Sequence, residues 1–444
     1  MTLEQSIKTH PMRPFQIFVI ALCIAVAMID GYEVLAMAFV APYLSHAWGI
    51  GPVQIGYLLS AGVFGMALGA VVISPLADWF GRRRHMIMCM SFIVVGMILS
   101  ALAGNVPQLI AARAFAGIFI GALISSLNIM VSEYSSDSRR GTAMGIYGIG
   151  LPAGVMVGGL TAGPLISAFG WRSAFLFGAA MTALALVVVL AFLPESIEYL
   201  VKKRPKNALA LYNNVASRLG YAPADQLPAP ELTADQAPAP ATHVTPQLLI
   251  RSAFLWIGYA CLMVAFYFSN TWTPKLIADA TGNARLGGLA EVLIAFGGIV
   301  GALLFAGLSL KIRTRFATAL IMVFGIVVYT LYADYFHNVD LALFLGVLVG
   351  ATTNGGLAAF YAISPTIYPA TIRGTGVGLM IGFGRSVGIL APIVAGQLLH
   401  VGWLPQEIYK LCGILLLVPA LAAILLEATY WRSAKSAKLS IIAE

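Results

Sequence analysis

Long apolar stretches, separated by short polar or charged segments, run through most of the sequence. They are continuous rather than alternating, and a backbone in lipid must satisfy its hydrogen bonds within the segment, so they predict helices rather than strands. Each is long enough to cross a hydrocarbon core of about 30 Å, which takes about 20 residues. We expect twelve membrane-spanning helices, at residues 16–44, 53–77, 86–103, 108–132, 141–168, 171–193, 248–278, 286–309, 316–333, 340–364, 374–400 and 407–430.

Composition supports this interpretation and excludes other classes of protein. Of the 444 residues, 60% are hydrophobic and 10% are charged, and the mean hydropathy is +0.89, whereas about 25% of an average soluble domain is charged. A soluble globular domain is therefore excluded, and the sequence lacks the periodic or polar low-complexity character of fibrous and disordered proteins. The four cysteines lie inside apolar stretches without paired spacing or a neighbouring histidine, so we predict no metal site. The expected fold is an all-α polytopic membrane protein.

Positive charges indicate how the chain is oriented. Among the 26 Lys and Arg residues, Arg113 and Arg385 lie well inside predicted helices. Four lie in connections or at helix ends on one side of the membrane, and the others lie on the opposite side; the four are Arg172, Lys275, Arg285 and Lys410. The positive-inside rule places the richer side, with both termini and the central loop, in the cytoplasm. The net charge of +8 therefore reflects topology, and no aromatic-basic module indicates a nucleic-acid partner.

The central loop divides the chain into two related halves. We expect an N-terminal six-helix half at 1–193, a cytoplasmic linker at 194–247 whose second part is rich in Ala and Pro, and a C-terminal half with its tail at 248–444. Arg140-Gly141-Thr142-x-x-Gly145 precedes the fifth helix, and Arg373-Gly374-Thr375-x-x-Gly378 precedes the eleventh. Two parallel six-helix pseudo-repeats are typical of a transporter whose halves rock about a site near the bilayer midplane.

The turn between the second and third predicted helices carries a family signature, Ser74-Pro75-Leu76-Ala77-Asp78-Trp79-Phe80-Gly81-Arg82-Arg83-Arg84. It resembles the G-x-x-x-D-R-x-G-R-R-R motif of the major facilitator superfamily, with Ser74 in place of Gly and Trp79 in place of Arg. Pro194-Glu195-Ser196 after the sixth helix is a further piece of that pattern. The resemblance implies the major facilitator fold and a gating role for residues at the cytoplasmic helix ends, namely Asp78, Gly81, Arg82, Glu133, Arg140 and Arg373.

A narrower resemblance lies in the first helix. Asp30-Gly31-Tyr32-Glu33 is similar to the Asp-Gly-aromatic-Asp element of the aromatic acid:proton symporter family, with Glu33 in place of the second Asp. Trp272-x-Pro274 and Gly382-x-Gly384-Arg385 are also similar to that family. The resemblance implies proton-coupled transport of a small aromatic carboxylate.

The charges within the predicted helices are candidates for the chemistry. Asp30 and Glu33 share one helix face at i, i+3, and an ionised carboxylate in low dielectric is unfavourable, so such a group pairs or binds a proton. We predict that both carry the coupling proton, with Arg113 as part of the charge relay, and that both also contact substrate. Arg385 is our candidate for gripping the substrate carboxylate, because a guanidinium binds carboxylates bidentately. The alternative is that these arginines and acids are internal ion-pair partners.

An aromatic substrate requires flat apolar walls and a few polar groups. The candidates within the predicted helices are Tyr32, Arg113, Asn128, Asn270, Trp272, Asn354 and Tyr361. Each Tyr or Trp has the alternative of being an interfacial anchor or a packing residue. Glu291 is a further acid within a helix, and we leave it outside the predicted site.

These features predict a proton-coupled symporter that imports a hydroxybenzoate-like acid across a bacterial cytoplasmic membrane by alternating access. No Walker motif is present, so we expect the proton gradient and no cofactor to drive it, and we expect it to act as a monomer. The alternatives within transport are a non-aromatic organic acid such as muconate, or export of drugs or metabolites, for which Gly159-x-x-x-Gly163-Pro164 offers an incomplete antiporter motif. A receptor would show a further soluble domain, and an enzyme would show a clustered nucleophile, metal or redox site; we find neither.

Overall fold

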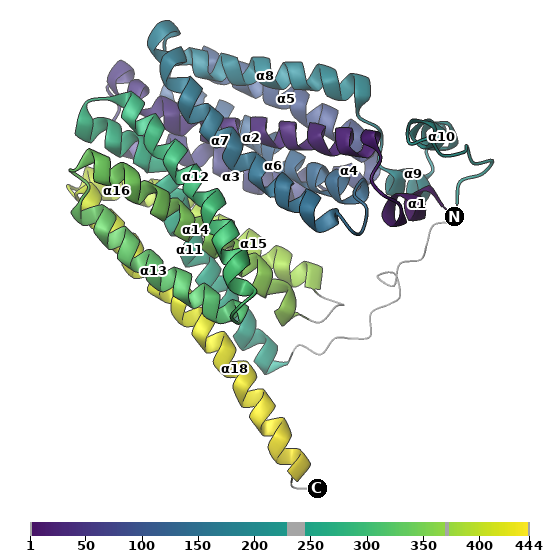
Figure 1. The fold of residues 1–444 in the computed structure, drawn as a ribbon. Coiled ribbons are helices and arrows are strands. Elements are labelled where there is room, and N and C mark those ends of the chain that lie inside the picture. Colours follow the sequence, from purple (N-terminus) through teal and green to yellow (C-terminus); the bar gives the residue numbers. More distant parts are fainter. Residues whose placement is uncertain (1, 229–244, 369–372, 443–444) are drawn as a thin grey trace. The chain divides into compact units, whose positions relative to one another are not determined.

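In a computed structural model, which describes residues 2–228, 245–368 and 373–442, the chain is helical (Figure 1). Twelve helical segments among these residues are long and apolar enough to cross a membrane. In the labels of Figure 1 they are α2 (Pro14–Trp48), α3 (Pro52–Val72), α5 (Arg82–Leu102), α6 (Val106–Glu133), α7 (Arg140–Phe169), α8 (Arg172–Phe192), α11 (Pro246–Thr281), α12 (Ala284–Ser309), α13 (Thr314–Asp334), α14 (Val339–Ile367), α15 with α16 (Arg373–Gly388, Leu390–His400) and α17 with α18 (Pro405–Leu415, Leu417–Ile442). The prediction of twelve membrane-spanning helices is confirmed.

The chain divides into two compact units. The first unit consists of Met1–Val40 and Ala61–Leu232, and the second of Ala41–Ser60 and Thr233–Glu444. In the first, α5 packs against α6 and α8; in the second, α14 packs against α12 and α13, and α11 against α15 and α18. The predicted boundaries at 193 and 248, and the role of the segment between them, stay predictions.

Two predicted helices, 374–400 and 407–430, are each interrupted once. The first breaks at Ile389 between α15 and α16, and the second at Leu416 between α17 and α18. Three residues after each break stands a proline, Pro392 or Pro419, which has no N–H to donate to the carbonyl four residues earlier. The helices end at the residues whose carbonyls lose that partner, Gly388 and Leu415.

Short helices occupy parts of the chain for which the apolar pattern predicted either a connection or the end of a longer membrane helix. α4 (Leu76–Phe80) follows the end of α3 at Val72, so the predicted extension of that span to residue 77 is wrong. α9 (Ile197–Lys203) and α10 (Ala208–Arg218) form the first part of the predicted linker, so this part is structured. α10 meets α1 (Leu3–Thr9), where the Leu3 amide donates to the Tyr212 hydroxyl over 3.0 Å. Residues 229–244 of the predicted linker lie outside the described residues.

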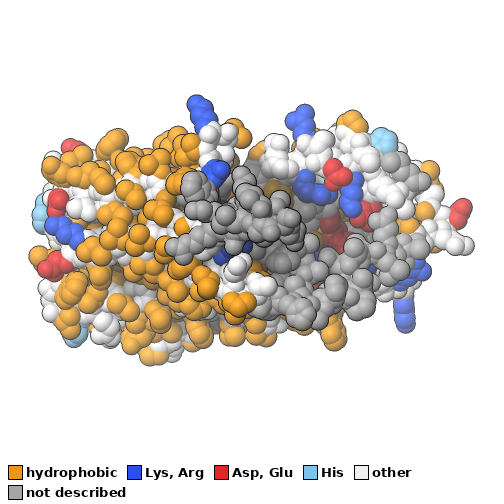
Figure 2. All heavy atoms as spheres, turned by 90° about the horizontal axis from the view of Figure 1, so that it is seen from below, with side chains coloured by type: hydrophobic (Ala, Val, Ile, Leu, Met, Phe, Trp, Pro, Cys, Tyr) orange, Lys and Arg blue, Asp and Glu red, His pale blue; other side chains and the backbone are white. Residues whose placement is uncertain are grey.

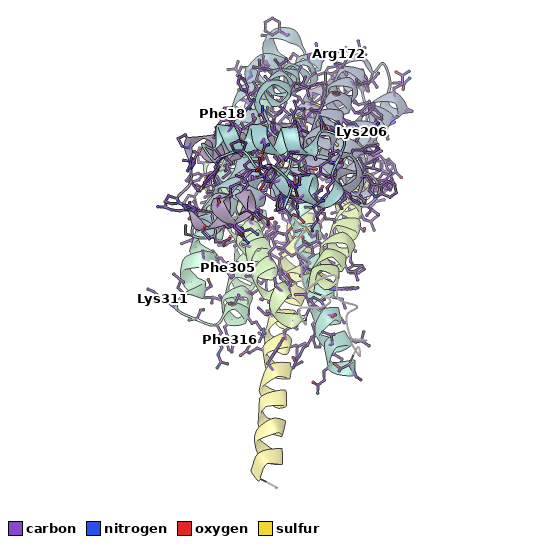
Figure 3. The ribbon with its side chains drawn as sticks, turned by 90° about the vertical axis from the view of Figure 1, so that its right-hand side faces the viewer. Phe18, Arg172, Lys206, Phe305, Lys311 and Phe316 are labelled. Carbon is purple, nitrogen blue, oxygen red and sulfur yellow. The ribbon has the colours of Figure 1, made fainter. Side chains whose placement is uncertain are left out.

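Hydrophobic side chains cover broad parts of the surface, as one face in Figure 2 shows. Leu184, Val187 and Leu303 are among the large apolar side chains that are more than half exposed. In the second unit, Figure 3 shows Phe305 and Phe316 on α12 and α13, with Lys311 in the turn between them. Large exposed apolar surfaces mark interaction sites in soluble proteins, and on helices of this length they are suited to contact with lipid.

Glycines allow several helices of the first unit to touch through their backbones. A Cβ added at Gly117 or Gly121 of α6 would overlap carbonyl oxygens of α3, and one at Gly154 of α7 would overlap the Met28 carbonyl oxygen of α2. Small residues at such positions are a common device of membrane helix packing. The α2–α7 contact holds the part of α2 that carries the predicted proton-coupling residues.

Replacing Gly154 with alanine is therefore expected to destabilise the first unit, because backbone stands where the new methyl group would lie. Overpacking of this kind costs about 1–3 kcal/mol. We expect a lower unfolding temperature of the purified protein in detergent. Gly145→Ala on the same helix is the matched control, because nothing lies within 4 Å of its Cβ position. An unfolding temperature as low for the control as for Gly154→Ala would contradict the packing argument.

Candidate functional site

A buried pair of carboxyl groups lies on α2 in the first unit. Asp30 and Glu33 are 2% and 0% exposed. Between them Tyr32 is also buried, and its hydroxyl donates to the Ala174 carbonyl of α8 over 2.7 Å. The Tyr32 ring meets Phe177 edge-on at a centroid distance of 5.5 Å. Tyr32 is thereby fixed against α8.

Arg113 on α6 reaches the same region, as the sequence predicts. Its guanidinium donates to the backbone carbonyl of Glu33 over 2.7 Å, and it contacts the Met97 sulfur at 3.2 Å. It also lies 5.6 Å from the centroid of the Phe175 ring, within the range of a cation–π contact. Among the described residues no ion pair joins Arg113 to a carboxylate. The arginine is therefore anchored on the helix backbone, and the carboxyl groups are left without a directly paired base.

The two carboxyl groups differ in their hydrogen bonds. Thr182 of α8 donates its hydroxyl to one Glu33 oxygen over 2.5 Å, while Glu33 Oε2 and Asp30 Oδ2 have no partner among the described residues. An unpaired buried carboxylate is strongly disfavoured, so each of these groups is suited to bind a proton. Sequence reasoning missed Thr182, because a single threonine in an apolar helix gives no signal of its own.

A second cluster surrounds Arg385 in the second unit. The phenol groups of Tyr259 and Tyr267 on α11 and of Tyr361 on α14 face its guanidinium. The Tyr259 and Tyr361 hydroxyls lie 3.2 Å apart. The cluster joins one cation to several aromatic faces and hydroxyl groups, which is a suitable set for an aromatic carboxylate.

Glycines on α15 make room for the tyrosine rings around Arg385. A Cβ at Gly384 would overlap the Tyr259 ring, and one at Gly388 would overlap the Tyr267 ring. The sequence singled out Tyr361 but not Tyr259 or Tyr267, because tyrosines eight residues apart in an apolar helix are usual packing residues. The glycines on either side of Arg385 were the available signal.

The other predicted substrate-binding residues lie in varied surroundings. Trp272 is buried, and its indole N–H donates to the Pro392 carbonyl over 3.0 Å, which is the arrangement of a packing residue. Asn270 and Asn354 each donate to a carbonyl of their own helix, over 2.8 and 3.2 Å. Asn128 on α6 is exposed. Contact between these residues and a substrate stays a prediction.

The residues predicted to gate form a network at helix ends of the first unit. Asp78 and Arg82 form an ion pair at 2.8 Å across the α4–α5 turn, where Gly81 has a φ of 95°. Arg140 pairs with Asp137 at 2.8 Å. The Ser196 hydroxyl donates to the Glu133 carboxyl group, whose two oxygens lie 2.9 and 2.7 Å from it. The side chain of Arg373 lies outside the described part of the structure.

Glu195 completes this network, a role that sequence analysis did not assign. One of its oxygens accepts the backbone N–H groups of Arg83 and Ser196, over 2.9 and 3.0 Å. It thereby satisfies an N–H group in the first turn of α5, where a negative charge is favourable. A Cβ at Gly81 would contact the Glu195 carboxylate, so this glycine makes room for it. The Pro194-Glu195-Ser196 motif was the available signal.

Glu195 is expected to make stability depend on pH. Burial raises its pKa above the ordinary value of 4.5, although backbone hydrogen bonds oppose the shift. The folded state therefore binds this proton more tightly than the unfolded state does, so the stabilisation is full below pH 4.5 and is lost as the pH rises through the raised pKa. We expect the unfolding temperature of the wild type, relative to Glu195→Gln, to fall over that interval. A difference that is flat or rises with pH would contradict this assignment, and Glu407→Gln, at an exposed helix end, is the control.

Several transporters are similar to this chain along most of its length. The 4-hydroxybenzoate transporter PcaK of Pseudomonas aeruginosa is 28% identical, over 91% of this chain and 90% of the relative. The gallate transporter of Pseudomonas putida is also 28% identical, over 94% and 92% of the two chains. The benzoate transport protein of Acinetobacter baylyi is 26% identical, over 90% and 87%.

The fold and the family model agree with one another. The xylose transporter XylE from E. coli, in an inward open conformation, matches with a TM-score of 0.70 over 93% of this chain and 95% of that chain. At 14% identity this likeness concerns the fold alone. The family model of the Major Facilitator Superfamily matches residues 20–333. This multi-pass membrane protein therefore belongs to the Major Facilitator Superfamily and is a transporter rather than an enzyme.

Proposed function

We propose that this protein transports small aromatic carboxylates together with protons. The observation that carries the substrate class is Arg385 among the phenol groups of Tyr259, Tyr267 and Tyr361. The names of the relatives, which transport 4-hydroxybenzoate, gallate and benzoate, support the same class. The carboxylate would pair with the guanidinium, and the ring would lie against the tyrosines.

Proton coupling is proposed for Asp30 and Glu33 of the first unit. Among the described residues, one oxygen of each carboxyl group has no hydrogen-bond partner, so both groups are suited to take up a proton. Arg113 supports the same segment of α2, because its guanidinium donates a hydrogen bond to the backbone carbonyl of Glu33. Loss of charge on protonation would lower the cost of reorienting the loaded carrier within the membrane. We propose import by alternating access across a bacterial cytoplasmic membrane, by a monomer with both termini in the cytoplasm and without a cofactor.

The ratio of protons to substrate decides which part of the proton gradient drives uptake. One proton with one monoanion moves no net charge, so only the pH difference contributes. A second proton makes the cycle electrogenic, and each charge then gains about 2.3 kcal/mol per 100 mV. Uptake and current must therefore be measured together.

The direct test uses purified protein in liposomes with an acidic exterior. The panel contains benzoate, 4-hydroxybenzoate, protocatechuate, gallate, muconate and a cationic drug. We expect uptake of at least one aromatic acid that depends on the pH difference and is abolished by a protonophore. Uptake of muconate alone would move the substrate to non-aromatic acids, and exchange of the drug for protons without uptake of any acid would replace the proposal by an exporter.

A further inference from the structure

Glu291 of α12 is a buried acid outside both clusters described above. Its side chain is 0% exposed, and neither carboxylate oxygen has a hydrogen-bond partner among the described residues. It also belongs to none of the ion pairs found in that part of the chain. The superfamily motifs identified in the sequence do not include it.

The neighbouring helices offer a hydroxyl group but no base. From α13, Tyr332 faces Glu291, and its hydroxyl has no hydrogen-bond partner among the residues that the structure describes. The Tyr332 ring lies 4.5 Å from that of Tyr409 on α17, whose hydroxyl is 2.5 Å from Thr273 of α11. Glu291 therefore stands beside a small aromatic and hydroxyl cluster in the second unit.

Charged groups on the remaining neighbours do not compensate Glu291. On α11, Lys275 is buried, and it pairs with Asp279 of its own helix at 2.7 Å. From α14, Gly350 approaches the Ile294 backbone and Gly346 lies near the Ala290 carbonyl, and neither is titratable. An ionised Glu291 would thus be an isolated negative charge in a nonpolar environment, which costs several kcal/mol.

A proton removes this cost more readily than a metal ion does. A hard cation in a protein requires about six oxygen ligands, whereas among the described residues no group of three or more His, Cys, Asp and Glu side chains could hold a metal ion. A protonated carboxyl group needs no such set of ligands, because it carries no net charge and has one hydrogen bond to donate.

We propose that Glu291 is a second proton-binding site, located in the second unit, and that it carries one further transported proton in each cycle. It is protonated in the conformation described and releases its proton when the transport cycle exposes it to water. The second part rests on the proposed symport function. With one proton from the Asp30–Glu33 pair and one from Glu291, import of a monoanion moves one net positive charge.

Infrared spectroscopy of the full-length protein in lipid nanodiscs tests proton binding without requiring transport. The wild type is expected to show C=O absorption of protonated carboxyl groups at neutral pH, and the component that comes from Glu291 should be lost in Glu291→Gln, while any component from Asp30 and Glu33 remains. Glutamine has the shape of the protonated acid, so this variant is expected to fold; Glu291→Asp, which keeps the group, should retain a shifted band. Glu407→Gln is the matched control, because Glu407 is an exposed acid and its loss should leave the band unchanged.

Current and uptake measured in the same liposomes test whether that proton is transported. We expect one net charge per substrate for the wild type and none for Glu291→Gln, with uptake still driven by the pH difference. The absence of a Glu291-dependent band, a band that responds to sodium at constant pH, or an unchanged charge-to-substrate ratio would each overturn the proposal. Wild-type liposomes that take up no acid would defeat the symport function instead, and the infrared result would then decide proton binding at Glu291 independently.

Discussion

Liposomes containing the Asp30→Asn variant are expected to exchange labelled for unlabelled aromatic acid but to lose the share of pH-driven accumulation that the proton of the Asp30–Glu33 pair supplies. Asn has the shape of a protonated aspartic acid, so the variant imitates the loaded state and cannot release a proton. Each of the two acids has one buried oxygen without a partner among the described residues, and Asp30 is chosen because Glu33 is also held by Thr182 through its other oxygen. For one coupled proton, a difference of one pH unit supplies about 1.4 kcal/mol, or up to about tenfold accumulation. This factor of up to about tenfold should be lost in Asp30→Asn, while the contribution of the proposed Glu291 proton remains.

Thr182→Val provides a graded comparison for Asp30→Asn. It removes the hydrogen bond to Glu33 and keeps both acids, so it should shift the pH dependence of uptake without abolishing coupling. Exchange and accumulation that fall together in Asp30→Asn would indicate a general loss of folding or binding. Accumulation at the wild-type level would exclude Asp30 from the coupling step.

Replacing Arg385 with glutamine is expected to raise the KM for the aromatic acid by about 30-fold or more. Truncating one partner of a desolvated charge pair costs about 2–5 kcal/mol, and about 1.4 kcal/mol corresponds to a factor of ten. Arg385→Lys should recover part of the affinity, because it restores the charge but not the planar pair of donors. Initial rates of uptake over a range of substrate concentrations give both the KM and the maximal rate.

Tyr361→Phe is the matched variant for the Arg385 cluster. It removes one hydroxyl, which lies 3.2 Å from the Tyr259 hydroxyl, and retains the ring. We expect a change of a few fold, with the largest effect on hydroxylated substrates. A KM unaffected by Arg385→Gln would separate this arginine from substrate binding and leave it as a structural partner of the tyrosines.

The sequence located features that depend on local chain properties. Apolar length defined the spans, and helical periodicity placed Asp30 and Glu33 on one face. Motifs identified the Gly81 turn and the arginine at 385. The helix breaks at Ile389 and Leu416 were not predicted, although the sequence contains the signal for them. Pro392 and Pro419 lack the N–H groups that would continue those helices.

The sequence could not predict which face of each helix points into the protein. Helices that are apolar on nearly every side carry little periodic signal that would identify the inward face. By itself the sequence determined the number and approximate bounds of the membrane helices, the superfamily, and the acids and arginines worth testing. Only the tertiary structure decided that Arg113 binds the Glu33 carbonyl, that three tyrosines face Arg385, and that Glu291 has no hydrogen-bond partner within the described part of the chain. The physical reason is that these contacts join different helices, so their geometry depends on how the helices pack and not on the spacing of residues along any one of them.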